Sequence, residues 1–293
     1  MSVSLKTWRD GSSTMRRMRV GIGLPAAVPE ADMASIGDWA AAAEGAGFAS
    51  VGVIDRLIYD NLDPLTALAA AAARTRRIEL TSTLINVCWR GNAVLLAKQL
   101  ASVDRLSGGR LTAGLGMGGW PADYKASGVS LNGRGKLFDA SLNAMEQAWR
   151  EAGAVPRILI GGAVQASFER AARPMSAGWV SPLFDLATLR GGAAAVRRAW
   201  DEAGRPGRPR VVTGRYFSLG PDADPTADAY IHHYYGDAYY DAARSETLTT
   251  GEQIEAELRR LAEAGCTDVV LFPCAGDLEQ VALLAAEVRG MNW

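Results

Sequence analysis

Three groups of residues in this 293-residue chain have types and spacings suited to chemistry. Gly161-Gly162-Ala163 follows an apolar run and precedes a short helical pattern. Bare amides at a helix start favour an anion such as phosphate, although an ordinary tight turn would use the same residues. Asp55-Arg56 ends another apolar run, where the two side chains could face a pocket or form a local ion pair. His233 suits acid–base chemistry near neutral pH, although a solvated aromatic helix face or a subunit contact explains it more simply.

The composition excludes several other classes of function. A net charge of -1 argues against a nucleic-acid surface, and 48% apolar with 22% charged residues indicates a globular core. Three cysteines and two adjacent histidines offer no metal-ligand spacing and no disulfide framework, so we expect no metal and a reduced, cytoplasmic setting. No run of about 18 apolar residues predicts a membrane span.

Eight apolar stretches alternate with helical patterns, and no Pro- or Ser-rich linker divides them. The stretches predict strands at 19–24, 50–54, 78–87, 110–115, 157–160, 177–180, 209–219 and 268–272. Helices are expected at 31–47, 64–74, 93–106, 134–151, 167–172, 186–202, 252–264 and 278–288, with a loop at 120–133 and a Tyr-rich insert at 222–249. The pattern predicts one (β/α)8 TIM barrel over 19–293, with an insertion after strand 7 and a disordered leader at 1–18. A doubly wound open sheet remains the alternative.

Several short motifs occur in one order along this pattern. They are Ala-Glu-Gly-Ala-Gly-Phe before Val-Gly-Val-Ile-Asp55, Asp63-Pro64-Leu65-Thr66, Leu106-Ser107-Gly108-Gly109-Arg110 before Gly114-Leu115-Gly116-Met117-Gly118, Ile158-Leu159-Ile160-Gly161-Gly162, Gly178-Trp179-Val180 and Ala264-Gly265-Cys266-Thr267-Asp268. Over roughly residues 19 to 290 the chain resembles the bacterial luciferase-like family of flavin- and deazaflavin-dependent oxidoreductases. The resemblance implies a (β/α)8 barrel, in agreement with the strand pattern.

The resemblance also implies where a cofactor would lie. It places the phosphate at the paired glycines, with Ala163 where many relatives have serine. It implies a non-prolyl cis peptide at Thr83–Leu84 whose bulge presses on the flavin ring, although a plain strand is the alternative. Small residues after the fourth strand would let a flat ring approach the backbone. The implied cofactor contacts are Thr81, Thr83, Leu84, Asn86, Gly116, Met117, Gly118, Gly161, Gly162, Ala163, Gly178 and Trp179.

The catalytic sets of two branches of the family are not present. The luciferase branch has a histidine where Asp55 stands, and the sugar-phosphate dehydrogenase branch has His, Trp and Glu where Arg56, Asp60 and Gly119 stand. Neither reaction is therefore transferred to this chain. The candidate catalytic residues are Asp55, Arg56 and His233.

The resemblance favours an FMN-dependent monooxygenase that uses O2 and reduced flavin supplied by a separate reductase. Aromatic residues near the expected pocket favour a hydrophobic or aromatic organic substrate. These residues are Trp89, Trp120, Tyr124, Phe184 and Tyr216. Two alternatives stay open: a deazaflavin-dependent hydride-transfer oxidoreductase and a flavin-binding protein without catalysis. The resemblance also suggests a homodimer.

Overall fold

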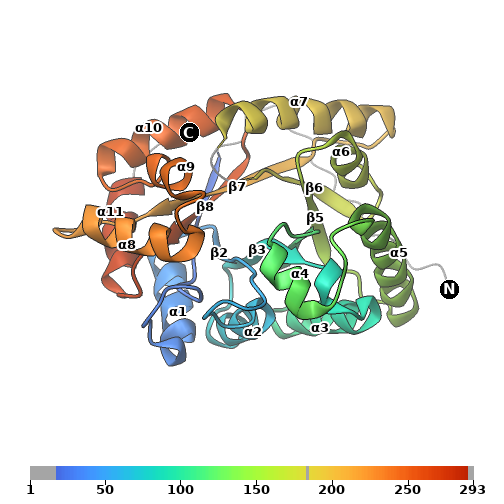
Figure 1. Ribbon diagram of the computed structural model, residues 1–293, viewed down its shortest axis with the longest axis horizontal. Helices are drawn as coiled ribbons and strands as arrows, with labels where there is room; N and C mark the ends of the chain where they lie inside the picture. The colour runs from blue at the N-terminus through green and yellow to red at the C-terminus, as the bar shows by residue number, and fades with distance from the viewer. Residues whose placement is uncertain (1–17, 183–184, 290–293) are drawn as a thin grey trace.

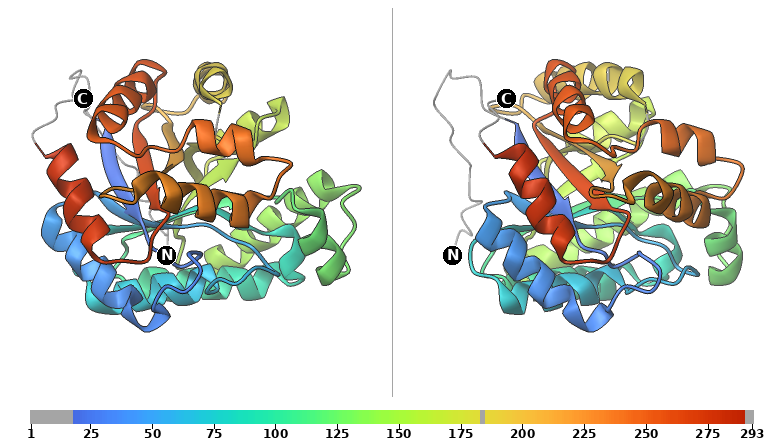
Figure 2. Two further views of the ribbon diagram at one scale, coloured as in Figure 1. Left: turned by 60° about the vertical axis from the view of Figure 1, so that its left-hand side comes forward. Right: turned by 90° about the vertical axis from the view of Figure 1, so that its left-hand side faces the viewer.

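The computed structural model describes residues 18–182 and 185–289, and in these ranges eight parallel strands close into a barrel surrounded by helices (Figures 1 and 2). The predicted (β/α)8 barrel is confirmed, and the open sheet is excluded because β1 pairs with both β2 and β8. The strands are β1 (Arg19–Gly23), β2 (Ser50–Val53), β3 (Glu79–Asn86), β4 (Leu111–Gly116), β5 (Arg157–Gly161), β6 (Ser176–Val180), β7 (Arg210–Phe217) and β8 (Asp268–Pro273).

The helices begin where the sequence offers caps. Asp63 accepts hydrogen bonds from the N–H groups of Leu65 and Thr66, and Asn92 accepts one from Leu95 as its position before a helical run predicts. The helices are η1 (Met33–Ser35), α1 (Ile36–Ala46), α2 (Pro64–Arg74), η2 (Cys88–Arg90), α3 (Ala93–Leu106), α4 (Pro121–Ser127), α5 (Arg134–Ala152), α6 (Gln165–Ala171), α7 (Leu186–Glu202), α8 (Ala223–Tyr235), α9 (Tyr240–Ser245), α10 (Gly251–Glu263) and α11 (Glu279–Val288).

Two segments differ from the sequence-based expectation. The predicted loop at 120–133 contains α4, which starts at Pro121, where proline's missing N–H costs nothing and its fixed φ suits a first helical turn. The insert at 222–249 folds into α8 and α9, and the buried face of α8 carries Tyr230 and Tyr234 with alanines, which is not the usual aliphatic helical pattern. The predicted leader lies outside the described residues except for Met18, which is buried.

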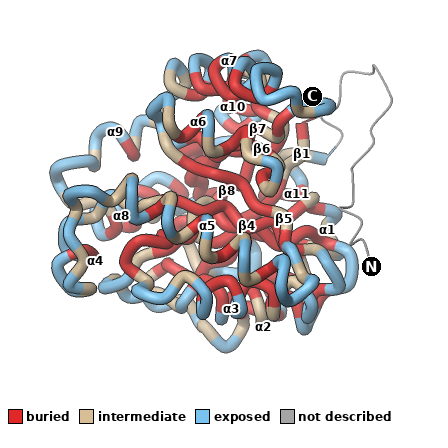
Figure 3. Tube along the Cα trace, turned by 90° about the vertical axis from the view of Figure 1, so that its right-hand side faces the viewer, coloured by how far each residue is buried: buried red, intermediate tan, exposed pale blue. Residues whose placement is uncertain are grey.

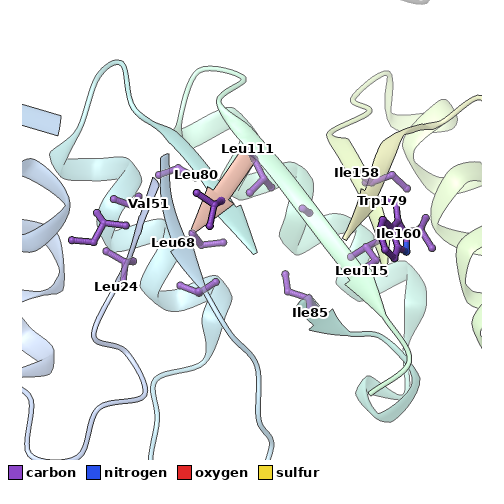
Figure 4. Packing of buried hydrophobic residues seen from close by; sticks show 14 of the residues in the cluster. Leu24, Val51, Leu68, Leu80, Ile85, Leu111, Leu115, Ile158, Ile160 and Trp179 are labelled. Carbon is purple, nitrogen blue, oxygen red and sulfur yellow. The ribbon is translucent and has the colours of Figure 1, made fainter. Parts of the chain in front are cut away.

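The core has one layer between strands and helices and another inside the barrel. Leu96, Leu100 and Val103 of α3 are buried against the barrel, as their spacing predicts, and each buried leucine contributes about 2 kcal/mol. The strands form the buried centre and the helices carry the exposed surface (Figure 3). Leu80 and Leu111 on neighbouring strands show the packing of the outer layer (Figure 4).

Charged residues close the end of the barrel where the strands begin. Arg210 Nη2 lies 2.6 Å from Asp268 Oδ1 and 2.9 Å from Glu79 Oε1, and Arg19 Nη1 lies 3.1 Å from Glu79 Oε2. Burial alone would lower the pKa of Arg210, but the two carboxylates raise it, so the guanidinium stays charged. This network fills the floor with side chains, which leaves the opposite end for a ligand.

Two motifs that carry the family resemblance contain Arg110 and Glu44, whose side chains connect neighbouring segments by hydrogen bonds near that floor. The Arg110 guanidinium donates to the carbonyl oxygens of Ile78 at 2.6 Å and Thr75 at 3.0 Å, which joins the start of β4 to the turn before β3. Glu44 accepts hydrogen bonds from three consecutive N–H groups, at 76, 77 and 78, and these bonds lower its pKa against the opposing effect of burial. Neither motif belongs to the ligand-facing end.

Candidate active site

The predicted cofactor residues lie on neighbouring strands at one end of the barrel. Leu84 is near the end of β3, Gly116 ends β4 and Gly161 ends β5. Because parallel strands end on the same face, these residues come together at the C-terminal mouth. Thr81 lies deeper, where its Oγ1 donates to the carbonyl of Thr112 at 3.1 Å.

A bulge interrupts β3 at the predicted position. The Thr83–Leu84 peptide bond is cis, as predicted, and the β3–β4 register shifts between Ser82 and Ile85. In the described part of the chain, the Oγ1 atom of Thr83 is buried without a hydrogen-bond partner. Leu84 is only half-buried. The bulge therefore combines an apolar side chain with an unpaired hydroxyl.

The glycines that end β4 and β5 make room for Leu84. A Cβ atom added to Gly161 would lie 2.3 Å from Leu84 Cδ1, and one added to Gly116 would lie 2.6 Å from the same atom. A Cβ on Gly114 would lie 2.2 Å from the carbonyl oxygen of Ser82. Of these glycines, Gly116 was expected to let a flat ring approach the backbone and Gly161 to lie at the phosphate. In the structure they seat the bulge on which such a ring would rest.

Aromatic packing fixes the loop after β4. Gly118 has φ +78°, and a Cβ there would lie 2.4 Å from the Trp89 ring, so both conformation and space require glycine. The hydroxyl of Tyr124 donates to the carbonyl of Met117. Trp89 and Tyr124, expected at the pocket, are buried and meet edge to face with ring centroids 5.5 Å apart. Phe184 lies outside the described residues.

Asp55 and Arg56 are adjacent in sequence but belong to two different ion pairs. The Asp55 side chain is 1% exposed, and its Oδ1 accepts a hydrogen bond from Arg90 Nη2 at 3.0 Å. Its Oδ2 accepts one from the backbone N–H of Asn86 at 2.8 Å. Burial raises the pKa of Asp55 to about 6, against the opposing effect of Arg90. Sequence reasoning did not find Arg90, because nothing local to η2 marks it as a partner of a residue 35 positions earlier.

Arg56 instead connects three loops of the mouth. Its Nε donates to Oδ2 of the fully buried Asp123 at 3.0 Å, and Asp123 also accepts the N–H of Leu57 at 3.2 Å. The guanidinium carbon lies 3.9 Å from the ring centroid of Trp120 and 5.5 Å from that of Tyr234. Cation–π contacts of this kind are strongest when desolvated. Arg56 thus joins the loop after β2 to α4 and to α8.

Aromatic side chains of α8 pack against β7 and β8, and Figure 1 shows α8, in orange, beside these strands. Tyr230 of α8 lies 5.5 Å from Tyr216 of β7 between ring centroids, and Tyr216 lies 6.1 Å from Phe272 of β8. The hydroxyls of Tyr216 and Tyr235 are 3.0 Å apart. Burial raises the pKa of these tyrosines well above the usual phenol value, so they stay neutral at physiological pH.

His233 occupies the other side of α8. It is exposed, and its Nδ1 lies 2.6 Å from the hydroxyl of Tyr59 in the loop after β2. The next residue, Tyr234, is buried against the barrel mouth. His233 therefore joins α8 to the Tyr59 loop.

The loop after β5 has a conformation that favours glycine. Gly162 has φ +127°, and its carbonyl accepts a hydrogen bond from Trp179 Nε1 at 2.7 Å. Ser167 of α6 packs beneath, where a Cβ on Gly162 would lie 2.4 Å from Ser167 Oγ. Gly178 has φ +150°, and a Cβ there would lie 2.1 Å from the carbonyl oxygen of Arg210. Trp179 therefore supports the paired glycines from β6, Gly178 makes room for the backbone at the start of β7, and Ala163 is exposed.

The cysteines are buried thiols. Burial raises the pKa of Cys88, Cys266 and Cys274, so each behaves as a small apolar residue. Within the described ranges no group of three or more His, Cys, Asp or Glu side chains is placed to hold a metal ion. Among the same residues, no helix combines the length and apolar character needed to cross a membrane.

A closed (β/α)8 barrel with a non-prolyl cis bulge on β3 and a glycine loop after β5 defines the class of the protein. Residues 18–290 match the family of luciferase-like monooxygenases, and the chain belongs to that family. An uncharacterized protein of Mycobacterium tuberculosis is 29% identical over 208 residues, which cover 57% of this chain and 71% of the relative. A 5,10-methylenetetrahydromethanopterin reductase of Methanolobus tindarius is 35% identical over 103 residues, which cover 35% of this chain and 30% of the reductase.

Solved structures share the fold at low identity. The monooxygenase RslO1 from Streptomyces bottropensis superposes with a TM-score of 0.76 at 22% identity, covering 92% of this chain and 97% of that protein. An F420-dependent secondary alcohol dehydrogenase superposes with a TM-score of 0.79 at 16% identity, covering 94% of this chain and all of that chain (100%). At these identities the likeness concerns the fold.

Proposed function

We propose that this protein is an FMN-dependent monooxygenase that uses reduced flavin and O2 on a hydrophobic or aromatic organic substrate. The observation that carries the proposal is the bulge of β3 between Ser82 and Ile85, which lies against the glycines that end β4 and β5. The partly exposed Leu84 side chain of this bulge offers an apolar surface to one face of a flat ring, and the Thr83 hydroxyl in the same bulge is buried without a hydrogen-bond partner. Family membership supports the same chemistry.

The remaining cofactor contacts follow from the geometry of the mouth. The ring would rest on Thr83 and Leu84, with Asn86 and the Gly116–Gly118 segment beside it. The phosphate would meet the backbone amides at 161–163, which Trp179 holds in place through the carbonyl of Gly162. Ser167 packs beneath Gly162 and supports the loop from below.

The chain would contribute positioning and exclusion of water. FMN, when reduced, supplies the electrons that activate O2. Trp120, Tyr216 and Tyr234 form an apolar wall that keeps water from the reacting atoms. Burial raises the pKa of the Tyr216 and Tyr234 phenols, so both stay neutral and add no charge to this wall. We further propose that a separate reductase delivers the reduced flavin, that the protein forms a homodimer, and that it works in the cytoplasm, where its free thiols stay reduced.

A deazaflavin-dependent hydride transfer is the second candidate. The stretch that is 35% identical to the methylenetetrahydromethanopterin reductase favours it, as does the fold of the alcohol dehydrogenase whose name includes that coenzyme. The same bulge would seat the deazaflavin ring, so coenzyme binding must decide between the two.

The test is a fluorescence titration of the protein with FMN and with the deazaflavin coenzyme, each oxidised and reduced. We expect reduced FMN to bind more tightly than the deazaflavin coenzyme. Riboflavin measures the part of the affinity that does not depend on the phosphate. Tighter binding of the deazaflavin coenzyme supports the second candidate, and binding of neither refutes both. Oxygen consumption with reduced FMN and a panel of aromatic compounds then separates an enzyme from a flavin-storage protein.

A further inference from the structure

Strand β3, which contains the bulge, extends further than its neighbour β2. The β2–β3 ladder ends where Val53 pairs with Ser82, immediately before the bulge. Beyond the bulge, β3 continues to Asn86 and pairs there only with β4. The side of β3 that faced β2 therefore has no strand to accept the N–H of Asn86.

Asp55 takes the place of the missing strand. Its Oδ2 accepts the N–H of Asn86 at 2.8 Å, and the side-chain Nδ2 of Asn86 donates to the backbone carbonyl of Asp55 at 3.0 Å. Two reciprocal hydrogen bonds thus hold the segment that follows the cis bond against the end of β2. Both residues are buried, so water does not compete for these bonds.

The other carboxylate oxygen of Asp55 is also occupied. Arg90 donates to it through Nη2 at 3.0 Å and reaches Asp63 through Nη1 at 3.1 Å. Asp63 caps the N-terminus of α2. Arg90 therefore anchors Asp55 to a helix, and the carboxylate cannot turn toward the mouth without breaking one of its bonds.

We propose that Asp55 is a positioning residue, which holds the β3 segment after the Thr83–Leu84 bond at a fixed height so that the bulge meets the cofactor ring. This inference rests on the proposed function. Asp55 acts through Asn86 and does not contact the substrate, because its side chain is 1% exposed and both of its oxygens accept hydrogen bonds from the protein.

Two isosteric variants test this role, Asp55→Asn and Asp63→Asn. Both remove one negative charge next to Arg90. An asparagine at position 55 has one acceptor for two donors, so either Asn86 or Arg90 loses its bond. An asparagine at position 63 still caps α2, because asparagine is as good an N-cap as aspartate. The second variant therefore controls for charge and leaves Asn86 untouched.

We expect hydrogen exchange at the Asn86 amide, measured without coenzyme, to become at least about tenfold faster in Asp55→Asn and to change less than about twofold in Asp63→Asn. The dissociation constant of the coenzyme should rise about tenfold in the first variant only, with a shifted absorption band of the bound ring. If Asp55→Asn does not fold, Asn86→Ala removes the bond to the Asp55 carbonyl and should accelerate exchange at the same amide by a smaller factor.

Unchanged exchange and unchanged coenzyme affinity in Asp55→Asn overturn the inference. Lost turnover with those two quantities unchanged would instead assign Asp55 a proton-transfer role. If the wild-type protein binds neither coenzyme, the proposed function fails. The exchange comparison then decides alone whether Asp55 holds Asn86, and equal rates in the two variants refute that.

Discussion

Replacing Gly161 with alanine should drive Leu84 out of its seat. The three nearest atoms to a Cβ at this position all belong to Leu84, at 2.3, 2.7 and 3.1 Å. The φ of Gly161 is not in the left-handed region, so the backbone accepts alanine without strain. Steric overlap with a single side chain is therefore the main effect of the substitution.

The expected magnitude follows from two opposing contributions. Inserting a methyl group into a packed site costs about 1–3 kcal/mol. Replacing glycine by alanine where φ permits stabilises by about 0.4–1 kcal/mol, because the unfolded chain loses freedom. Steric overlap is the larger contribution, so Gly161→Ala should lower the free energy of unfolding by about 1–2 kcal/mol. Pushing Leu84 outward should also weaken coenzyme binding.

A double-mutant cycle with Leu84→Ala isolates the overlap. In urea denaturation, Gly161→Ala should be neutral or slightly stabilising in the Leu84→Ala background, which gives a coupling energy of about 2 kcal/mol. Gly119→Ala is the matched control, because no atom lies within 4 Å of its Cβ and it is exposed. An equal cost of Gly161→Ala in both backgrounds would refute the claim that Leu84 fills this space.

Three further predictions concern other parts of the mouth. Burial raises the pKa of Asp55 from 3.8 to about 6, so the folded state binds this proton more tightly than the unfolded state. As the pH rises from 4 to 6, the free energy of unfolding of the wild type should therefore fall by up to about 3 kcal/mol relative to that of Asp55→Asn. Urea denaturation at several pH values measures both free energies, and an equal dependence on pH in the two proteins would contradict the prediction. Arg56→Ala breaks the ion pair of the fully buried Asp123 and should lower the free energy of unfolding by about 3 kcal/mol. It should also speed proteolysis at 222–249, and unchanged proteolysis would show that α8 is held by other contacts. Ala163→Ser adds a donor at the glycine loop and should raise FMN affinity about threefold to tenfold without changing riboflavin affinity, and an equal gain for both would place the phosphate elsewhere.

The sequence predicted the barrel because its signals are local and repeated. Apolar strands, helical stripes such as Leu96 and Leu100, and caps such as Asn92 each depend on neighbours within one or two turns. For α8 the sequence indicated only an aromatic helix face around His233 and not the bounds of the helix, because its buried face consists of Tyr230, Tyr234 and Ile231 with alanine, a pattern without the usual leucine stripe.

The site could be predicted only in part. The cis bond at Thr83–Leu84 followed from the family resemblance and is confirmed. The separate partners of Asp55 and Arg56 did not follow, because Arg90 and Asp123 are brought to them by the closure of the barrel. Two charged residues that are adjacent in a loop can therefore pair with residues from different elements, and their sequence positions do not indicate which.

The shared aromatic packing of α8 with Tyr216 and Phe272 limits how the insert can be engineered. Excising residues 222–249 would leave two large rings of the barrel wall facing solvent, so a shortened chain would be prone to aggregate. Grafting the insert onto another barrel would require transplanting Tyr216 and Phe272 with it.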